Sequence, residues 1–220
     1  VVVARGFMTH LLRQLFFAAV ARPFLLIVLG LNVRRREQLP KHGPAIVVAN
    51  HNSHLDVLVL MSLFSLKQLP HIRPIAARDY FLSNRLLAWF ALNIIGIIPF
   101  ERQLQGVHAD PLLVVSAAVE RGEIVIIFPE GSRGEPEHLA AFKSGVAHLA
   151  RRHPDLPFHP VFLHGLGKAL PCGEALLVPF FCDVFVGSPL TWTGDKATFM
   201  KELTHRMTAL ANEGHFPPWA

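Results

Sequence analysis

Apolar runs and polar breaks alternate along the chain and divide it into expected strands and helices. Short apolar runs bounded by polar, proline or glycine residues predict buried strands at 45–49, 72–76, 97–100, 124–128, 159–163 and 175–186. Apolar positions at helical spacing predict helices at 57–66, 85–95, 110–121, 143–152 and 195–212. Strands that alternate with helices indicate an α/β fold: a single domain with a mixed, mostly parallel sheet flanked by helices.

The N-terminal region is apolar in a different way. Two strongly apolar segments, 15–21 and 24–29, are separated by Arg22-Pro23. Proline breaks a helix, and an arginine near a bilayer centre costs about 2.5–3.5 kcal/mol on insertion scales. Two short helices lying in the membrane interface therefore fit better than one span. A single span with Arg34–Arg36 on the cytosolic side remains the alternative, and a cleaved signal peptide fits less well because no small-residue cleavage site follows.

The pattern thus predicts two parts. Residues 1–36 form an apolar, basic membrane-association segment, an N-terminal helical membrane anchor, and residues 37–220 form the α/β domain. The chain has 220 residues, of which 51% are hydrophobic and 17% charged. That length allows one sizeable core, and the charged fraction is too high for a bundle of membrane spans. Two cysteines give no disulfide framework, which favours a reducing, cytosol-facing location.

The net charge of +5 is concentrated near the N-terminus. Residues 1–42 contain seven lysines and arginines against Glu37 alone, so the remainder is about neutral. These basic residues flank apolar residues and do not interleave with aromatic ones on a strand or helix face. An anionic membrane surface is therefore the expected partner, and nucleic acid is not.

A polar cluster, Asn50 to Asp56, directly follows the first buried strand of the domain. His51 and Asp56 are five residues apart, so inside one helix their side chains would point about 140° apart. They can meet if His51 lies in a turn before the helix and Asp56 lies in its first turn. A carboxylate on one imidazole nitrogen leaves the other nitrogen free as a base. Ser53-x-x-Asp56 is also a helix capping box, so a purely structural Asp56 is the competing interpretation.

Two further polar clusters, Glu101-Arg102 and Glu130 to Arg133, end other apolar runs. Guanidinium groups suit phosphate oxygens, and two arginines near one base indicate an anionic substrate. Gly131 permits a sharp turn whose backbone N–H groups could add anion contacts. Either arginine alone could equally be a solvated loop residue.

Other chemistries fit less well. Glu130 stands where the nucleophile elbow G-x-S-x-G would need a glycine, so Ser132 is not expected to be a nucleophile. His51, His54 and Asp56 do not have the spacing of a metal site. No metal and no cofactor are therefore expected.

Four segments in this order resemble the motif blocks of the glycerolipid acyltransferase family, the 1-acylglycerol-3-phosphate (PlsC-like) acyltransferases. The blocks are Asn50-His51-x4-Asp56, Gly96-x5-Arg102, Phe128 to Arg133 and Pro160-Val161, and Phe142-Lys143-x-Gly145 is also similar to the family. The chain departs from the pattern at two positions. Ser132 replaces the commoner threonine and keeps the hydroxyl, and His159 precedes the fourth block where an apolar residue is usual.

The resemblance implies a reaction. His51, paired with Asp56, would take the proton from the free hydroxyl of 1-acylglycerol-3-phosphate, and the oxygen would attack the thioester of acyl-CoA or acyl carrier protein. The product would be phosphatidic acid, made in phospholipid biosynthesis at the cytoplasmic face of a membrane, without a covalent acyl-enzyme and without a cofactor. The residues expected to bind the phosphate and glycerol of the acceptor are Arg102, Glu130, Gly131, Ser132 and Arg133.

Three other functions remain open on the sequence. The same chemistry could act on another lysophospholipid or lysolipid. The chain could also be a non-catalytic lipid-binding protein of the membrane surface, although intact His51, Asp56, Glu130 and Arg133 count against it. A hydrolase is disfavoured by the missing elbow. The sequence does not predict the acyl donor, the acyl-chain length or the oligomeric state.

Overall fold

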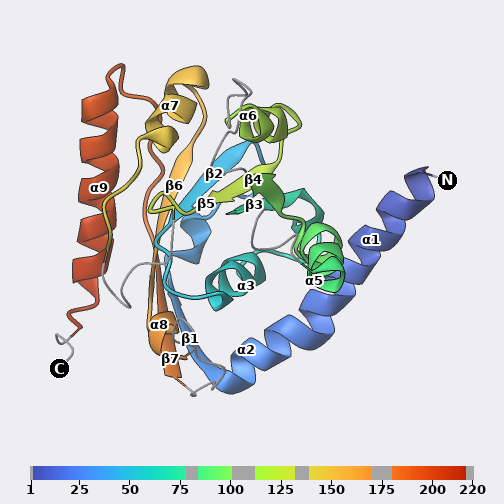
Figure 1. Cartoon of the computed structure of the whole chain (residues 1–220). Helices are drawn as coiled ribbons and strands as arrows, with labels where there is room; N and C mark the ends of the chain where they lie inside the picture. The colour runs from blue at the N-terminus through green and yellow to red at the C-terminus, as the bar shows by residue number, and fades with distance from the viewer. Residues whose placement is uncertain (1, 78–83, 101–111, 132–138, 170–179, 217–220) are drawn as a thin grey trace.

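The strands form one mixed sheet. The structure, a computed structural model, describes residues 2–77, 84–100, 112–131, 139–169 and 180–216. Within these residues seven strands lie in the order β1-β7-β6-β2-β5-β3-β4 (Figure 1). All neighbours are parallel except β6 and β7, which confirms the predicted mixed, mostly parallel sheet. The strands are β1 (Leu29–Arg34), β2 (Ala45–Ala49), β3 (Ile72–Ala77), β4 (Ile98–Phe100), β5 (Ile124–Ile127), β6 (Phe158–His164) and β7 (Phe180–Val186).

Helices cover both faces of this sheet, as expected for an α/β domain. One face carries α1 (Val2–Phe16), α2 (Arg22–Val28), α3 (Leu55–Ser62) and α5 (Arg85–Phe90). The other face carries α6 (Leu113–Glu120), α7 (Gly145–Arg152) and α9 (Lys196–Glu213), and Figure 1 shows α9 and the α1–α2 helix on opposite sides of the sheet. A short helix, α8 (Leu166–Ala169), follows β6. We call these two sides the α1 face and the α9 face.

Each face has its own hydrophobic core. In β2, Ala45, Val47 and Ala49 pack into the core of the α1 face, whereas Ile46 and Val48 pack into the core of the α9 face. All five residues are buried, which is why this strand is apolar throughout and does not alternate with polar residues.

The N-terminal helix does not break where the sequence predicted. It runs through Arg22-Pro23, because a π-helical turn at Phe17–Ala21 connects α1 to α2 (Figure 1). In this turn the N–H of Arg22 donates to the carbonyl of Phe17, five residues back. The wider turn and the position of Pro23 at the start of α2 accommodate the missing proline N–H. The prediction of two separate helices is therefore wrong.

The first strand of the sheet lies before residue 37. β1 lies in the segment that the sequence assigned to the membrane, yet it pairs in parallel with β7 from Leu29 to Arg34. Burial alternates along β1, but the strand follows the apolar helix without a polar break, so the sequence pattern did not reveal it as a strand. Before β1, residues 2–28 form the continuous helix.

The basic residues near the N-terminus bind the domain itself. Arg13, Arg22, Arg35 and Arg36 each donate to backbone carbonyls, and two of the acceptors follow the end of α3. Helix C-termini attract cations, so these contacts stabilise the packing of the N-terminal helix. The charge excess was expected to face an anionic membrane, but the structure places these four guanidinium groups on internal partners. The acceptors are Leu69 and Asn93 for Arg13, Phe64 for Arg22, Leu63 for Arg36 and Val186 for Arg35.

Candidate active site

The register of two central strands brings the polar clusters together. β2 and β5 are parallel neighbours, with Val48 opposite Ile127. His51 and Glu130 each lie three residues beyond this pair, so both leave the sheet at its carboxyl edge. That edge is where open α/β sheets bind ligands.

His51 and Asp56 are in contact, in the arrangement that their spacing allowed. His51 Nδ1 lies 2.8 Å from Asp56 Oδ2, with His51 in the turn before α3 and Asp56 in its first turn. The same carboxylate oxygen accepts the backbone N–H groups of Asn52 (2.7 Å) and Ser53 (2.9 Å). The Asp56 carboxylate therefore serves the helix start and the imidazole at once, and the two competing interpretations of this residue describe one arrangement.

The electrostatics of the pair follow from burial. Asp56 is completely buried, and burial raises the pKa of its carboxyl group. The hydrogen bonds from His51, Ser53 and Asn52 act in the opposite direction and favour the carboxylate. With Asp56 ionised, His51 Nδ1 carries the hydrogen and Nε2 is left as an acceptor. The His51 side chain keeps 21% of its surface exposed, so Nε2 can meet a ligand.

The Phe128 ring packs against the face of the His51 imidazole. The two rings stack with 4.2 Å between centroids and 24° between planes. The sequence pattern alone did not indicate this role for Phe128. The available signal was an aromatic residue at the end of the predicted strand, directly before Pro129-Glu130.

Two asparagines fix the turn that carries His51. Asn50 donates to the carbonyl of Leu163 (2.8 Å) and accepts from its N–H (2.7 Å), and Asn52 donates to the same carbonyl (3.1 Å). Leu163 belongs to β6, the neighbour of β2 on its other side. The turn is therefore tied to two adjacent strands, which limits the positions that His51 can take.

Glu130 is a buried carboxyl group beside the base. It is only 5% exposed, and burial raises its pKa to about 7. The backbone N–H groups of His51 and Ala140 lower the pKa in part, and the Asp56 carboxylate raises it. Neither oxygen of Glu130 accepts a hydrogen bond of normal geometry from the part of the chain that the structure describes. At neutral pH, such a group can accept a proton from a ligand or accept a hydrogen bond from a ligand hydroxyl.

Gly131 is required by the turn and by a neighbour. Its φ of +75° lies in the left-handed region, and a Cβ there would fall 2.5 Å from Lys143 Nζ. The N–H of Lys143 donates to the Pro129 carbonyl (2.9 Å), so the segment before α7 is bonded to this turn. Lys143 thus brings an ammonium group to the site, a role that its place in the family motif did not indicate.

The remaining predicted residues divide into two groups. Arg102, Ser132 and Arg133 lie outside the described residues. Gly96, which opens the second block, has a φ of +77°, and a Cβ there would fall 2.0 Å from Arg13 Nη2. His159, the departure in the fourth block, is buried and its Nδ1 lies 2.7 Å from the Gln38 carbonyl. Gly96 is therefore needed for the backbone conformation beside Arg13, and His159 is held by a backbone contact inside the domain.

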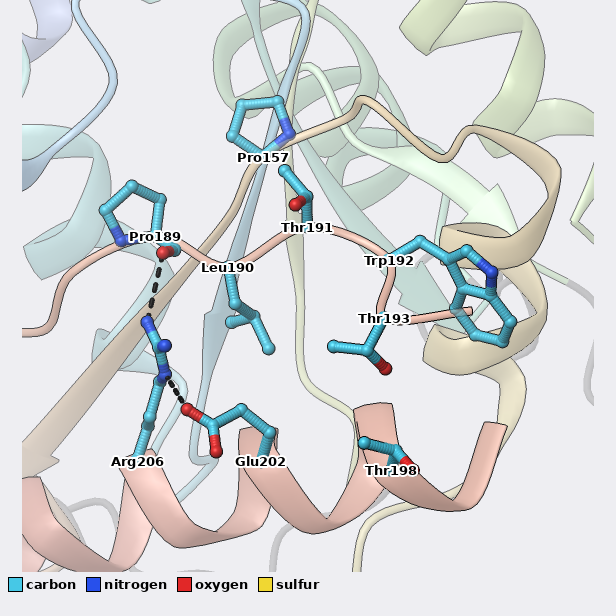
Figure 2. A pocket seen from close by; sticks show the side chains of 9 residues that line it. All are labelled: Pro157, Pro189, Leu190, Thr191, Trp192, Thr193, Thr198, Glu202 and Arg206. Carbon is cyan, nitrogen blue, oxygen red and sulfur yellow. Dashed lines mark hydrogen bonds and ion pairs between the residues drawn. The ribbon is translucent and has the colours of Figure 1, made fainter. Parts of the chain in front are cut away.

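A hollow lies away from this edge, between α9 and residues 189–193 (Figure 2). Arg206 lines it but is already bound, to Glu202 at 2.6 Å and to the carbonyls of Ser188 and Pro189 at 3.0 Å. The hollow holds none of the predicted site residues. Over the described ranges, no three His, Cys, Asp or Glu side chains come together as metal ligands.

Comparison with known proteins identifies the family. The profile of the family described as Acyltransferase matches residues 30–164, more than half of the chain. The chain belongs to the acyltransferase family. This acyltransferase is 29% identical over 166 residues to the chloroplastic 1-acyl-sn-glycerol-3-phosphate acyltransferase LPAT1 of Arabidopsis thaliana, covering 75% of this chain and 43% of the relative. It is also 29% identical over 188 residues to the alpha 1-acyl-sn-glycerol-3-phosphate acyltransferase of Homo sapiens, covering 82% and 63%.

The chain spans about half the length of the curated relatives it matches. Its fold is shared with a solved structure, the 1-acyl-sn-glycerophosphate acyltransferase PlsC of Thermotoga maritima. The two structures superpose with a TM-score of 0.76 at 20% identity, covering 99% of this acyltransferase and 83% of the other chain.

Proposed function

We propose that this acyltransferase moves a fatty acyl group from acyl-CoA or acyl carrier protein to the free hydroxyl of 1-acylglycerol-3-phosphate and so makes phosphatidic acid. The observation that carries the proposal is the 2.8 Å contact of His51 Nδ1 with the buried Asp56 at the carboxyl edge of the sheet. The names of the relatives support the same reaction.

The chemistry follows from the orientation of the imidazole. His51 Nε2 takes the hydroxyl proton of the acceptor as the oxygen attacks the thioester carbonyl. The C–S bond then breaks, and the thiolate takes up the proton held by the imidazolium. Asp56 stabilises the imidazolium that forms and keeps the ring in the required tautomer. This route needs no acyl-enzyme.

The acceptor would bind beside Glu130 and Gly131. A buried carboxyl group with a pKa of about 7 can accept a hydrogen bond from a glycerol hydroxyl, and the Gly131 turn lies next to the Lys143 ammonium group. We assign Arg102, Ser132 and Arg133 to the phosphate of the acceptor, following the family motif. Arg102→Ala and Arg133→Ala are then expected to raise the KM for the acceptor more than the KM for the acyl donor. Equal effects on both would contradict this assignment.

A membrane location fits the α1 face. Eleven of the fourteen exposed large hydrophobic side chains among the described residues belong to residues 8–27 and 86–92. Met8–Ile27 is a helix long and apolar enough to cross a membrane, but its inner side packs on the domain through Arg13, Phe17 and Leu25. A helix docked in this way would have to leave the domain in order to span. We therefore propose that the enzyme lies on the cytoplasmic face of the membrane.

Replacing the base tests the reaction. His51→Ala is expected to lower the turnover of 1-acylglycerol-3-phosphate by about 10²–10⁴-fold, the usual contribution of general-base catalysis, with an unchanged unfolding transition. His54→Ala, at the exposed neighbouring histidine, is the matched control and should keep a near wild-type rate. Near-normal turnover of folded His51→Ala would refute the assignment.

A panel of acceptors tests the substrate. Wild-type enzyme with radiolabelled acyl-CoA should acylate 1-acylglycerol-3-phosphate faster than lysophosphatidylcholine or lysophosphatidylethanolamine. A faster reaction with one of these would identify another lysophospholipid as the acceptor. Release of free fatty acid without an acceptor would indicate a hydrolase, and binding without turnover of any of these lipids would indicate a lipid-binding protein.

A further inference from the structure

Lys143 lies against the turn that carries Glu130. A Cβ on Gly131 would fall 2.5 Å from Nζ of Lys143, 2.8 Å from its Cε and 3.0 Å from its Cδ. The end of the lysine side chain therefore occupies the space that a larger residue at position 131 would fill. The N–H of Lys143 also donates to the Pro129 carbonyl (2.9 Å). Both the backbone and the side chain of Lys143 are thus placed at this turn.

The same turn is connected to the proposed base. The N–H of Gly131 donates to the Phe128 carbonyl (3.1 Å), and the Phe128 ring stacks on His51. The backbone N–H of His51 acts on the Glu130 carboxyl group and lowers its pKa in part. Lys143 therefore belongs to the group of residues around His51.

The Lys143 ammonium group has no partner among the residues that the structure describes. Lys143 is exposed, and its side chain makes no hydrogen bond or ion pair within that part of the chain. The Glu130 oxygens accept no hydrogen bond of normal geometry from the described residues, so this carboxyl group does not bind the ammonium group. A cation and a buried carboxyl group at one turn thus both remain available to a ligand.

Helix stability does not explain a lysine at this position. Lys143 and Ser144 directly precede α7, whose first turn contains no acidic residue and is not capped by the Ser144 side chain. The amino end of a helix carries a partial positive charge, so a lysine there is unfavourable for the helix. The ammonium group and the helix start both favour an anion beside the Gly131 turn.

The neighbouring carboxyl groups allow a bound anion. Asp56 Oδ2 is bonded to His51 and to two backbone N–H groups. Burial raises the pKa of Glu130 to about 7, so Glu130 is partly protonated at neutral pH and repels a phosphate less than an ordinary glutamate does. Glu130 remains suited to a hydroxyl group of the same ligand.

We propose that Lys143 is a specificity-determining residue whose ammonium group binds the phosphate of the acceptor. The inference rests on the proposed function and adds to it a residue that was not assigned to the phosphate. In 1-acylglycerol-3-phosphate, the reacting hydroxyl and the phosphate are on adjacent carbon atoms. The phosphates of the acyl donor are separated from its thioester by the whole pantetheine arm. A cation among the residues around His51 therefore suits the phosphate of the acceptor better than those of the donor.

Acceptor kinetics test the inference. Lys143→Met keeps an unbranched side chain on Gly131 and removes the charge. The KM for 1-acylglycerol-3-phosphate is expected to rise about ten- to a hundredfold, as for the loss of a charge-assisted hydrogen bond. The kcat and the KM for palmitoyl-CoA should stay near wild type. An unchanged acceptor KM, or an equal rise in both KM values, would overturn the inference. A fall in kcat alone would also overturn it, because it would assign the ammonium group to the oxyanion of the reacting thioester.

A matched variant separates a site from general charge. Lys201→Met makes the same change at an exposed lysine of α9 and should leave the acceptor KM unchanged. A rise as large as that of Lys143→Met would mean only long-range attraction and would overturn the inference.

A binding measurement keeps this inference distinct from the proposed reaction. Isothermal titration calorimetry compares 1-hexanoylglycerol-3-phosphate, a short-chain acceptor, with 1-hexanoylglycerol, which has no phosphate. Lys143→Met should bind the phosphate compound about ten- to a hundredfold more weakly than wild type does, and the two proteins should not differ with 1-hexanoylglycerol. No binding of the phosphate compound by wild type, or an equal loss with both compounds, would overturn the inference.

The two measurements together show which proposal fails. Absent transfer to every lysophospholipid, together with the expected binding pattern, would refute the reaction and not the role of Lys143. Normal transfer with equal affinities of wild type and Lys143→Met for the phosphate compound would refute the role of Lys143 and not the reaction.

Discussion

The two faces of the sheet differ in what their helices present outward. The helices of the α1 face expose residues such as Leu26, Ile27 and Trp89 to solvent, whereas α6 of the α9 face exposes only Leu113 and Val114 among the large hydrophobic side chains. The catalytic edge lies between the two faces. His51, the proposed base, therefore lies at the edge of the sheet, between an apolar face and a more polar one.

The apolar face is attached to the domain by polar contacts. Arg13 and Arg22 bind internal carbonyls while their neighbours on the helix point outward. Removing residues 1–32 would take away most of β1 and uncover buried Phe17 and Leu25. Truncation would therefore disturb the fold and the membrane surface together, and point substitutions separate the two.

The largest change in stability is expected at Arg13, which binds α1 to the rest of the domain. Arg13 is 2% exposed, burial lowers its pKa to about 10, and it donates to the carbonyls of Leu69 and Asn93. Arg13→Ala removes the donor to the buried Leu69 carbonyl and to the partly buried Asn93 carbonyl and leaves a cavity, so the free energy of unfolding should fall by about 3–5 kcal/mol, measured by urea denaturation. Arg34→Ala, at a half-exposed arginine 3.7 Å from Glu213, should cost about 1 kcal/mol or less. Similar losses in both variants would mean that Arg13 does not fasten the helix.

A smaller effect is expected at the catalytic edge between the faces. Because the pKa of Glu130 in the folded protein is raised to about 7, the folded state holds a proton that the unfolded state releases above about pH 4.5. Wild type should therefore lose stability as the pH rises from about 4.5 to 7, and Glu130→Gln should not. The variant should be about 3 kcal/mol more stable than wild type at pH 8, from a shift of about 2.5 pKa units at about 1.4 kcal/mol per unit. Urea denaturation at pH 4 and pH 8 measures the gap, and a gap of equal size at both values would contradict the burial of an ionisable Glu130.

The outward side chains of the two faces can be compared directly. Leu26 and Ile27 are 73% and 83% exposed on the α1 face, and Leu113 and Val114 are 57% and 45% exposed on the α9 face. Leu26→Gln/Ile27→Gln should weaken binding to phospholipid vesicles by about ten- to a hundredfold, because interfacial affinity scales with buried apolar area. Leu113→Gln/Val114→Gln makes the same change on the other face and should bind as wild type does. Sedimentation with vesicles measures both, and equal losses would remove the distinction between the faces.

The sequence predicted the parts of this molecule that depend on local patterns. The strands around β2 and β5 and the His51–Asp56 contact followed from burial and spacing. It did not predict the continuous helix through Pro23, because the π-helical turn that accommodates the proline depends on packing and not on residue type. Nor did it predict the use of Arg13 or the stacking of Phe128 on His51, since both join residues that are distant in sequence.

The smallest change in stability is expected at the N-terminal caps of two helices, α5 on the α1 face and α9 on the α9 face. The side chain of Asn84 accepts the N–H groups of Leu86 (2.9 Å) and Leu87 (3.4 Å) and caps α5, whose Leu86 and Trp89 are exposed. Asn84→Ala should cost about 1 kcal/mol and speed amide exchange in the first turn of α5. Asp195 caps α9 on the other face by accepting the N–H of Thr198 (2.8 Å), so Asp195→Ala should speed exchange in the first turn of α9.

Phospholipid vesicles should change amide exchange in Asn84→Ala but not in Asp195→Ala. If the α1 face rests on lipid, burial of Leu86 and Trp89 in the interface stabilises α5, and added vesicles should slow its exchange in Asn84→Ala toward the wild-type rate. The first turn of α9 faces water, so vesicles should leave its exchange in Asp195→Ala unchanged. Hydrogen exchange with and without vesicles measures both, and equal rescue of the two variants would show that lipid does not prefer the α1 face.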